Sequence, residues 1–127
     1  MEAFKSMSEI ALGKKVCLMA SELGHRLFRM NTGLAWVGES LKFSKPMKIE
    51  VMPGDVLIRK ARPFHSGFIG MSDYGGWTKD GRTLWCEIKT PIGKIKPEQI
   101  SFIDAVNKAG GIAGIVRDEE TAFELLS

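Results

Sequence analysis

The sequence is poor in the residues that hold small proteins together through disulfides or zinc, with two cysteines and two histidines among its 127 residues. Cys17 and Cys86 lack the spacing of a metal-binding pair, and apolar residues flank each of them, so we expect free, buried thiols. Such thiols are typical of a reducing compartment, and the sequence therefore predicts a cytoplasmic protein. His25 and His65 have no paired ligand spacing, which argues against a zinc site.

Long apolar runs are also missing from the sequence. The first residues include two acids and no signal-peptide core, and no other stretch is long enough to span a membrane, so we expect a soluble protein with no membrane partner. There is no G-x-S-x-G elbow of a serine hydrolase and no G-x-x-x-x-G-K-[ST] loop, so no nucleotide cofactor is expected. The formal charge of +3 is too small to indicate nucleic-acid binding by itself.

The composition that remains is typical of a globular protein, with 44% hydrophobic and 26% charged residues. No repeat or low-complexity segment interrupts it. A chain of this length builds one hydrophobic core of useful size and is too short for two. Residues 1–127 are therefore predicted to form a single domain.

Three segments combine the apolar spacing of helices with residues that begin and end them. Ser8 can cap the first helix and Gly24 can end it, and Pro97 suits the first turn of the second. At a 3.6-residue period Glu9 falls on the edge of the apolar stripe of the first helix, whereas Glu22 falls on its polar face. The predicted helices cover residues 8–23, 97–109 and 118–126.

Two strand-like runs flank Lys79-Asp80-Gly81, and Asp-Gly between such runs is a strong signal for a hairpin. Residues 52–70 mix prolines and glycines with basic and apolar residues, which indicates a long excursion rather than a linker between domains. Together the elements predict a mixed α/β fold. The predicted strands cover residues 25–37, with a break at Asn31-Thr32-Gly33, and residues 41–51, 72–78, 82–90 and 112–116.

Charged residues alternate with apolar ones in the run 84–89. Residues two apart in a strand share a face, so one face is apolar and the other carries Glu87 and Lys89 side by side. The preceding hairpin strand can bring Asp73 close to Glu87, and two converging carboxylates repel each other unless a cation lies between them. Oxygen ligands suit Mg²⁺ or Mn²⁺. The two faces are formed by Leu84, Cys86 and Ile88 and by Trp85, Glu87 and Lys89.

Such a site suits the hydrolysis of a phosphodiester. A divalent cation polarises a phosphoryl oxygen and acidifies a water, and Lys89 can orient the nucleophile or stabilise the charge that develops. An isolated Glu-x-Lys has a simpler interpretation, because it is more often a solvated strand face with a cross-strand ion pair. The motifs around it favour the metal site.

The motifs are Arg29-x-Asn31-x-Gly33, Gly70-x-Ser72-Asp73, Glu87-Ile88-Lys89, Gly93-Lys94-x-Lys96-Pro97-Glu98-Gln99 and Ala109-Gly110-Gly111-Ile112-Ala113-x-Ile115-Val116-Arg117. They occur in order and at fitting separations, and together they resemble the VRR-NUC family, the virus-type replication-repair nucleases of the PD-(D/E)xK superfamily. The resemblance is strongest from 70 to 117 and weakest from 39 to 66. The family pattern predicts a smaller aliphatic residue where Tyr74 follows Asp73.

The resemblance assigns roles to six positions. It implies that Asp73 and Glu87 bind the metal together with the backbone carbonyl of Ile88, and that Lys89 is the catalytic lysine. Glu9 matches a glutamate of the family's first helix, where it can hydrogen-bond a metal-bound water. Gln99 matches a helix glutamine of the catalytic set, although a glutamine in a first helical turn also serves ordinary capping.

The resemblance also implies a fold and an activity. The fold is a restriction-endonuclease-like PD-(D/E)xK core, with a mixed central sheet flanked by helices. The activity is a Mg²⁺- or Mn²⁺-dependent DNA endonuclease that selects branched DNA by shape, in particular a four-way junction resolvase acting as a homodimer. The alternatives are a flap or general DNA nuclease of the same fold, a non-catalytic nucleic-acid-binding module, and a hydrolase of small phosphoesters.

Basic residues are candidates for contacts to DNA phosphates, and the alternative for them is an ordinary solvated surface. Aromatic residues are candidates for stacking on bases, and the alternative for them is burial in the core. We expect at least two of Trp36, Trp77 and Trp85 to be buried. Arg59 and Lys60 are further basic residues in the segment that the family motifs leave unaligned. The predicted phosphate contacts are Lys42, Lys45, Lys48, Arg62, Lys94 and Lys96.

Overall fold

The computed structural model describes residues 8–30, 36–63, 67 and 69–127. It divides into two units, one formed by residues 1–32 with 67–127 and the other by residues 33–66. The helices and strands of the described residues all lie in the first unit. The predicted single domain over residues 1–127 stays a prediction.

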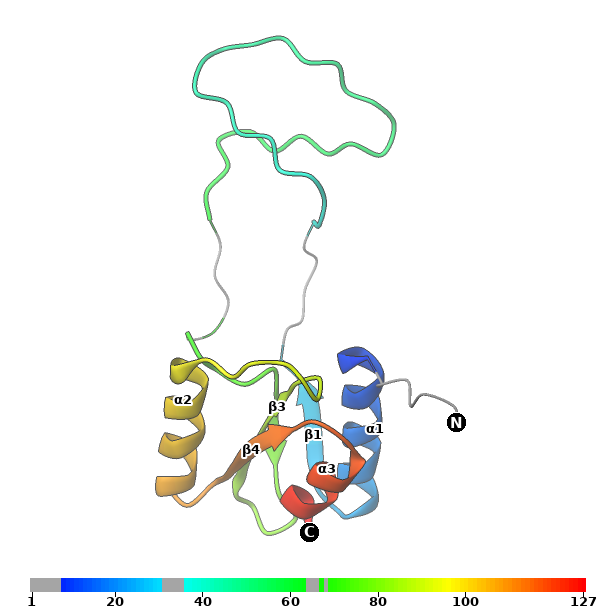
Figure 1. The fold of residues 1–127 in the computed structure, drawn as a ribbon, viewed down its shortest axis with the longest axis vertical. Helices are drawn as coiled ribbons and strands as arrows, with labels where there is room; N and C mark the ends of the chain where they lie inside the picture. The colour runs from blue at the N-terminus through cyan, green and yellow to red at the C-terminus, as the bar shows by residue number, and fades with distance from the viewer. Residues whose placement is uncertain (1–7, 31–35, 64–66, 68) are drawn as a thin grey trace. The chain divides into compact units, whose positions relative to one another are not determined.

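The first unit is a mixed α/β structure, as the sequence predicts (Figure 1). A four-stranded sheet has the order β1-β2-β3-β4, in which β1 and β3 both run antiparallel to β2, whereas β4 runs parallel to β3. The elements are α1 (Glu9–Glu22), β1 (Arg26–Arg29), β2 (Tyr74–Trp77), β3 (Thr83–Ile88), α2 (Pro97–Lys108), β4 (Ile112–Val116) and α3 (Glu119–Leu126).

The helix ends follow from local capping. The Ser8 hydroxyl accepts a hydrogen bond from the Ala11 N–H at 3.2 Å and begins α1, and Gly24, with φ of +89°, allows the chain to turn after it. Pro97 is the first residue of α2, and the Asp118 carboxylate caps α3 by accepting from the Thr121 N–H at 2.8 Å. The three predicted helices are confirmed to within two residues at each end.

The predicted hairpin between β2 and β3 is also confirmed. The Thr78 N–H donates to the Arg82 carbonyl at 2.7 Å, and the Gly81 N–H donates to the Thr78 carbonyl at 3.0 Å. Gly81 has φ of +85°, a conformation that a residue without a side chain adopts without strain. This turn sets the register of the two strands, and the register sets which residues meet at the other end of the hairpin.

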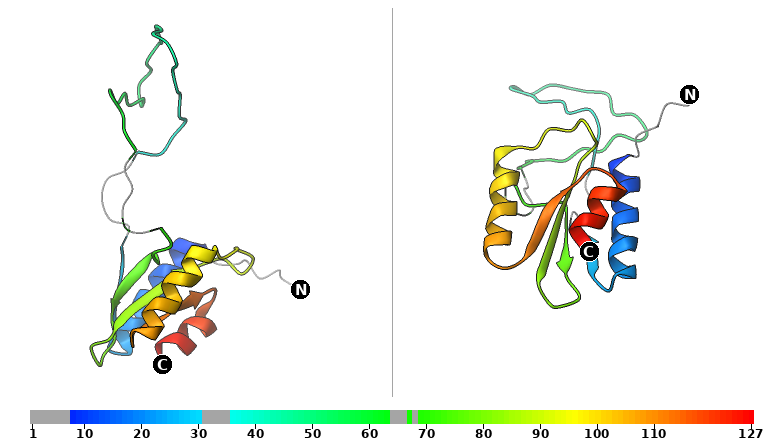
Figure 2. Two further views of the ribbon diagram at one scale, coloured as in Figure 1. Left: turned by 90° about the vertical axis from the view of Figure 1, so that its left-hand side faces the viewer. Right: turned by 60° about the horizontal axis from the view of Figure 1, so that its bottom comes forward.

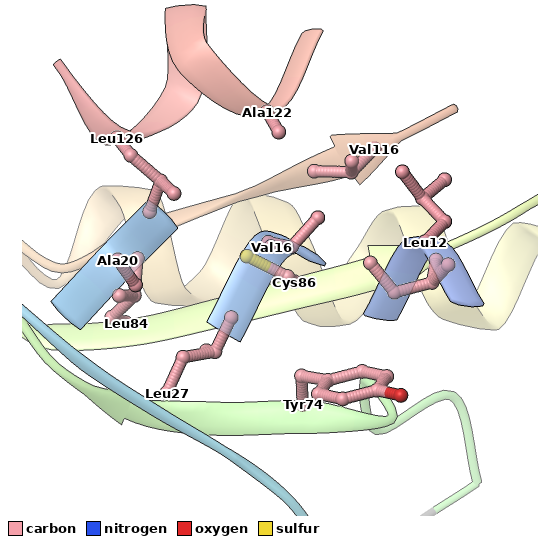
Figure 3. Packing of buried hydrophobic residues seen from close by; sticks show 11 residues of the cluster. Leu12, Val16, Ala20, Leu27, Tyr74, Leu84, Cys86, Val116, Ala122 and Leu126 are labelled. Carbon is pink, nitrogen blue, oxygen red and sulfur yellow. The ribbon is translucent and has the colours of Figure 1, made fainter. Parts of the chain in front are cut away.

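Helices cover both faces of the sheet. α1 and α3 pack on one face, and α2 packs on the other, against β3 and β4 (Figure 2). The main core lies between the sheet and helices α1 and α3 (Figure 3). As predicted, one face of β3 is plain core, because its alternate residues are fully buried there. The core residues that Figure 3 labels are Leu12, Val16, Ala20, Leu27, Tyr74, Leu84, Cys86, Val116, Ala122 and Leu126.

Tyr74, which departs from the family pattern, is buried in this core. Its ring fits because Gly13 of α1 has no side chain. A Cβ atom at Gly13 would collide with the hydroxyl end of the Tyr74 ring. The large residue on β2 is therefore matched by a glycine on the facing helix.

The second unit has neither a helix nor a strand among residues 36–63. The predicted strand over 41–51 is therefore wrong. Its apolar residues alternate as in a strand, but they are exposed, no strand within these residues pairs with it, and Pro46 lacks the N–H that a ladder needs. One local turn is at Met52 and Asp55, where the Asp55 N–H donates to the Met52 carbonyl at 3.0 Å.

Three further expectations have mixed outcomes. The strand predicted over 25–37 is reduced to β1, and residues 31–35, which include its predicted break, lie outside the described residues. Both cysteines are free thiols, with Cys86 buried and Cys17 half-buried. The burial of at least two tryptophans is wrong, because Trp36 is 64% exposed and Trp77 is 51% exposed.

Among the described residues, none of the helices combines the length and apolar character needed to cross a bilayer.

Because Gly13 and Tyr74 are in contact, the effect of Gly13→Ala on the free energy of unfolding should change sign when Tyr74 is replaced. Gly13→Ala should destabilise the protein by about 1 kcal/mol or more, because the added methyl group overpacks the core. In a Tyr74→Leu background the same change should stabilise it by up to about 1 kcal/mol, since alanine is the better helix former. Urea denaturation of the four proteins measures both differences. A stabilising effect in both backgrounds would contradict the packing described here.

Candidate active site

The predicted acids and lysine lie at one end of the sheet. The register pairs Tyr74 with Cys86, so that Asp73, just before β2, stands opposite Glu87 in β3. Lys89 follows β3 directly, and its N–H donates to the Val116 carbonyl at 3.0 Å, which continues the pairing with β4. The hairpin thus brings Asp73, Glu87 and Lys89 to neighbouring positions, as the sequence analysis expects.

Glu87 is only 1% exposed, which is unusual for a carboxylate. Its Oε1 accepts a hydrogen bond from Gln99 Nε2 at 2.9 Å and lies 3.8 Å from Lys89 Nζ. Its Oε2 is buried without a hydrogen-bond partner. Burial and the nearby charge of Asp73 raise the pKa of Glu87 to about 7, against the opposing effects of Lys89 and of the nearby Asp73 backbone N–H. A buried carboxyl oxygen without a partner is costly unless a further group binds it.

Asp73 is the more open of the two acids. Desolvation of its carboxyl raises the pKa of Asp73, Glu9 raises it further, and the cations Lys89 and Arg29 lower it. Its backbone carbonyl accepts from the Met30 N–H at 2.8 Å, which continues the β1–β2 pairing by one residue. The residue is therefore held by backbone bonds while its carboxylate stays accessible.

A small cleft of about 90 Å³ opens beside Asp73. Glu9, the first residue of α1, is exposed and lies at this cleft, so the carboxylate at the edge of the helix stripe faces the acids rather than the core. Ile88, whose carbonyl is the predicted third ligand, is the last residue of β3 and also lines it. The lining residues are Glu9, Ile10, Arg29, Asp73, Tyr74 and Ile88.

The Gln99 side chain caps α2 and also contacts Glu87. Its side-chain oxygen accepts from the Lys96 N–H at 2.9 Å and so caps α2, while its amide nitrogen donates to Glu87. The capping bond fixes the amide so that its N–H points at the carboxylate. Gln99 therefore orients Glu87 through a side chain that the helix terminus holds in place.

Gly70 explains part of the motif that precedes Asp73. It has φ of +88°, and a Cβ atom there would collide with the backbone carbonyl of Glu98 at the start of α2. The missing side chain lets the segment before β2 run directly against this helix. The same close approach brings Gln99 and the two acids to one end of the sheet.

Two arginines that lie at or near the site were assigned no separate role in the sequence analysis. Arg29 pairs with Tyr74 across β1 and β2 and lines the cleft, although only its place in a family motif pointed to it. Arg117 Nη1 donates to the carbonyls of Thr90 and Gly93, each at 2.7 Å, and fastens the segment between β3 and α2. No sequence signal other than the final motif distinguished Arg117 from a surface arginine.

The predicted DNA-contacting cations fall in two groups. Lys94 and Lys96 are exposed. They lie between Lys89 and Gln99, in the segment that Arg117 holds. The others belong to the second unit, where they are exposed, and their contact with DNA stays a prediction. They are Lys42, Lys45, Lys48 and Arg62.

The donor atoms at this site fit a hard divalent cation. Within the part of the chain that the structure describes, no three His, Cys, Asp or Glu residues gather closely enough to hold a metal. Mg²⁺ does not need such a cage, because one or two carboxylates with waters and substrate phosphates satisfy it. The unpartnered Glu87 Oε2 and the accessible Asp73 carboxylate supply these oxygens. Ser72, beside Asp73, has a second buried oxygen without a partner.

A larger cavity of about 290 Å³ lies among the hairpin turn, β4 and α3. It is lined largely by leucines and by Ile112. Its one carboxylate, Asp80, already accepts bonds from Thr78 and from Arg82. The smaller cleft, with open carboxylates and a lysine beside it, is therefore the better candidate for catalysis.

Comparisons with protein-family models, with curated proteins and with solved structures found no match to this chain. The functional assignment therefore depends on the residues of the chain itself.

The buried Glu87 predicts how stability depends on pH without metal. Its pKa rises from the ordinary value of 4.5 to about 7, so the folded state binds more protons than the unfolded state in this range. The free energy of unfolding should fall as pH rises from 4.5 through 7, by a few kcal/mol, since each pKa unit corresponds to about 1.4 kcal/mol. Urea denaturation in EDTA measures it.

Glu87→Gln is the matched test, because the amide keeps the size of the side chain and cannot ionise. This variant should lose most of the fall in stability. An equal fall in the variant and in the original protein would show that Glu87 is not the group responsible.

Proposed function

We propose that this protein is a Mg²⁺- or Mn²⁺-dependent DNA endonuclease of the VRR-NUC type, with a PD-(D/E)xK core. The observation that carries the proposal is the buried carboxylate of Glu87, with one oxygen unpartnered, next to Asp73 and Lys89. An ordinary solvated Glu-x-Lys pair would leave both charged groups in water. Here Glu87 is buried and the Lys89 side chain is only 19% exposed.

In this proposal the two carboxylates and the Ile88 carbonyl hold the cation. When bound, Mg²⁺ or Mn²⁺ supplies Lewis-acid polarisation of a phosphoryl oxygen and a more acidic water. Gln99 keeps the Glu87 carboxylate oriented through the bond at 2.9 Å. Lys89 Nζ, 3.8 Å from Glu87 Oε1, is close enough to hold the attacking water and to stabilise negative charge on the phosphate.

The other residues at the cleft bind a water or the phosphates of DNA. Glu9 lies at the cleft with Asp73 and can accept a hydrogen bond from a water there. Arg29 adds a cation on the same side, and Lys94 and Lys96 follow in an exposed segment held by Arg117. These positive side chains suit contacts to the phosphates that flank the one being cut. No base-reading helix is evident among the residues that the structure describes, so the proposed selectivity is for the shape of DNA.

The proposed substrate is a four-way junction, and the proposed assembly is a homodimer. The chain carries one set of Asp73, Glu87 and Lys89, which cuts one strand at a time. Resolution of a junction needs cuts in two strands, and a two-fold dimer supplies two sites related by the symmetry of the junction. A cytoplasmic setting completes the proposal.

Cleavage of labelled DNA tests the function. With Mg²⁺ or Mn²⁺ the protein should cut a four-way junction faster than a flap or linear duplex, and EDTA should stop cleavage. Asp73→Asn, Glu87→Gln and Lys89→Met should each slow cleavage by at least about 100-fold, because each removes a group that acts on the reacting phosphate. Gln99→Ala and Glu9→Ala should cost about 10- to 100-fold.

DNA binding, measured by fluorescence anisotropy in EDTA, should persist in all of these variants. Glu98→Gln and Lys108→Met are matched controls on exposed positions of α2 and should cut normally. Cleavage by Glu87→Gln at a rate near that of the original protein would contradict the assignment. Equal cutting of junction and linear duplex would contradict only the junction part.

A further inference from the structure

The α2 side of the sheet is covered unevenly. α2 packs against β3 and β4, whereas two aromatic side chains on β1 and β2 remain open, with Phe28 49% exposed and Trp77 51% exposed. Arg26 pairs with Trp77 in the register, and Phe28 lies two residues beyond Arg26, so all three side chains share this face. Leu27, between them, points into the core on the other side.

The aromatic rings on this face form a row across three strands. Phe28 pairs with Gly75, and Gly75 pairs with Trp85. Because Gly75 has no side chain, the Trp85 ring lies over it, where a Cβ atom would collide with the ring. Phe28 and Trp77 have ring centroids 5.5 Å apart. Trp85 closes the row against α2, with its ring edge-on to Phe102 at 5.2 Å.

The charge on β1 and β2 is of one sign. On the open face they contribute one cation, Arg26, and no acid, because Arg29 shares the other face of β1 with Leu27. Arg26 Nη1 donates to the neutral Ser21 hydroxyl at 3.0 Å, so its charge is available to a ligand. Exposed rings next to cations are the combination that proteins use to bind single-stranded nucleic acid, in which bases stack on the rings and phosphates meet the cations.

This face is continuous with the candidate active site. Asp73 immediately precedes β2, and because it lies two residues before Gly75 and four before Trp77, its side chain shares their face. From Trp77 to Asp73 the strand rises by about 13 Å, at about 3.3 Å per residue. A few nucleotides therefore reach from the open rings to the acids.

A second copy of the chain fits the same face less well. A two-fold interface brings a patch against itself, so Arg26 of one edge strand would face Arg26 of the other. Like charges in such an interface are destabilising, whereas a polyanion is attracted by Arg26. The observations therefore favour a nucleic acid over a dimer contact.

We propose that the open face of β1 and β2 binds single-stranded DNA, with bases stacked on Phe28 and Trp77 and phosphates near Arg26. The inference rests on the proposed function for the identity of the polymer. Its test measures binding alone, in EDTA, and does not require cleavage.

The probe is a short fluorescein-labelled oligothymidylate, compared with a blunt duplex of the same length by anisotropy in EDTA. Phe28→Ala and Trp77→Ala should each weaken binding of the single strand by about 5- to 100-fold. Binding of the duplex should change by less than about two-fold, because its bases are already stacked. Phe123→Ala, which removes an exposed ring from α3, should leave both affinities unchanged.

Conservative variants separate stacking from folding. Phe28→Trp should bind the single strand at least as tightly as the original protein, and Phe28→Leu, which keeps an apolar side chain without a ring, should bind as weakly as Phe28→Ala. Circular dichroism establishes that each variant is folded.

Two outcomes would overturn the proposal. One is binding of the single strand by Phe28→Leu and Trp77→Ala as tight as that of the original protein. The other is conversion of a dimer to a monomer by both alanine variants in sedimentation, which would make this face an interface between copies. A nuclease that cuts duplex DNA but shows either result would retain the proposed function and lose only the stacking surface.

Discussion

The arrangement of the candidate site depends on the buried carboxylate of Glu87. An ionised carboxylate taken out of water is destabilising unless hydrogen bonds and opposite charge compensate for the lost hydration. The protein supplies one hydrogen bond from Gln99 and one cation, Lys89, both on the same oxygen. The other oxygen has none. This incomplete compensation raises the pKa of Glu87, and it leaves an oxygen free to bind a cation.

The architecture explains why Glu87 is nevertheless held firmly. Its neighbours in β3, Cys86 and Ile88, are anchored in the core on the opposite face of the strand. The hairpin register fixes Asp73 opposite, and the glycine at position 70 lets α2 approach closely enough for Gln99 to reach. Core packing therefore holds Glu87 in place despite the free-energy cost of burying its charge.

Most of the first unit could be predicted from the sequence because its signals are local. Caps such as Ser8, the Asp80-Gly81 turn and the alternation in β3 each act within a few residues. The strand predicted over 41–51 failed because alternation says nothing about a pairing partner. The exposure of Trp77, the depth of Glu87 and the role of Arg117 depend on where α2 and its preceding segment pack, and no short window of sequence contains that information.

The most direct test of the central claim is calorimetric titration of Mg²⁺ or Mn²⁺ into the metal-free protein, without DNA. The account predicts saturable binding that Glu87→Gln abolishes and that Glu98→Gln, which removes an exposed carboxylate from the same end of α2, leaves intact. Binding of equal strength in the Glu87→Gln variant, or no binding by the original protein, would contradict it.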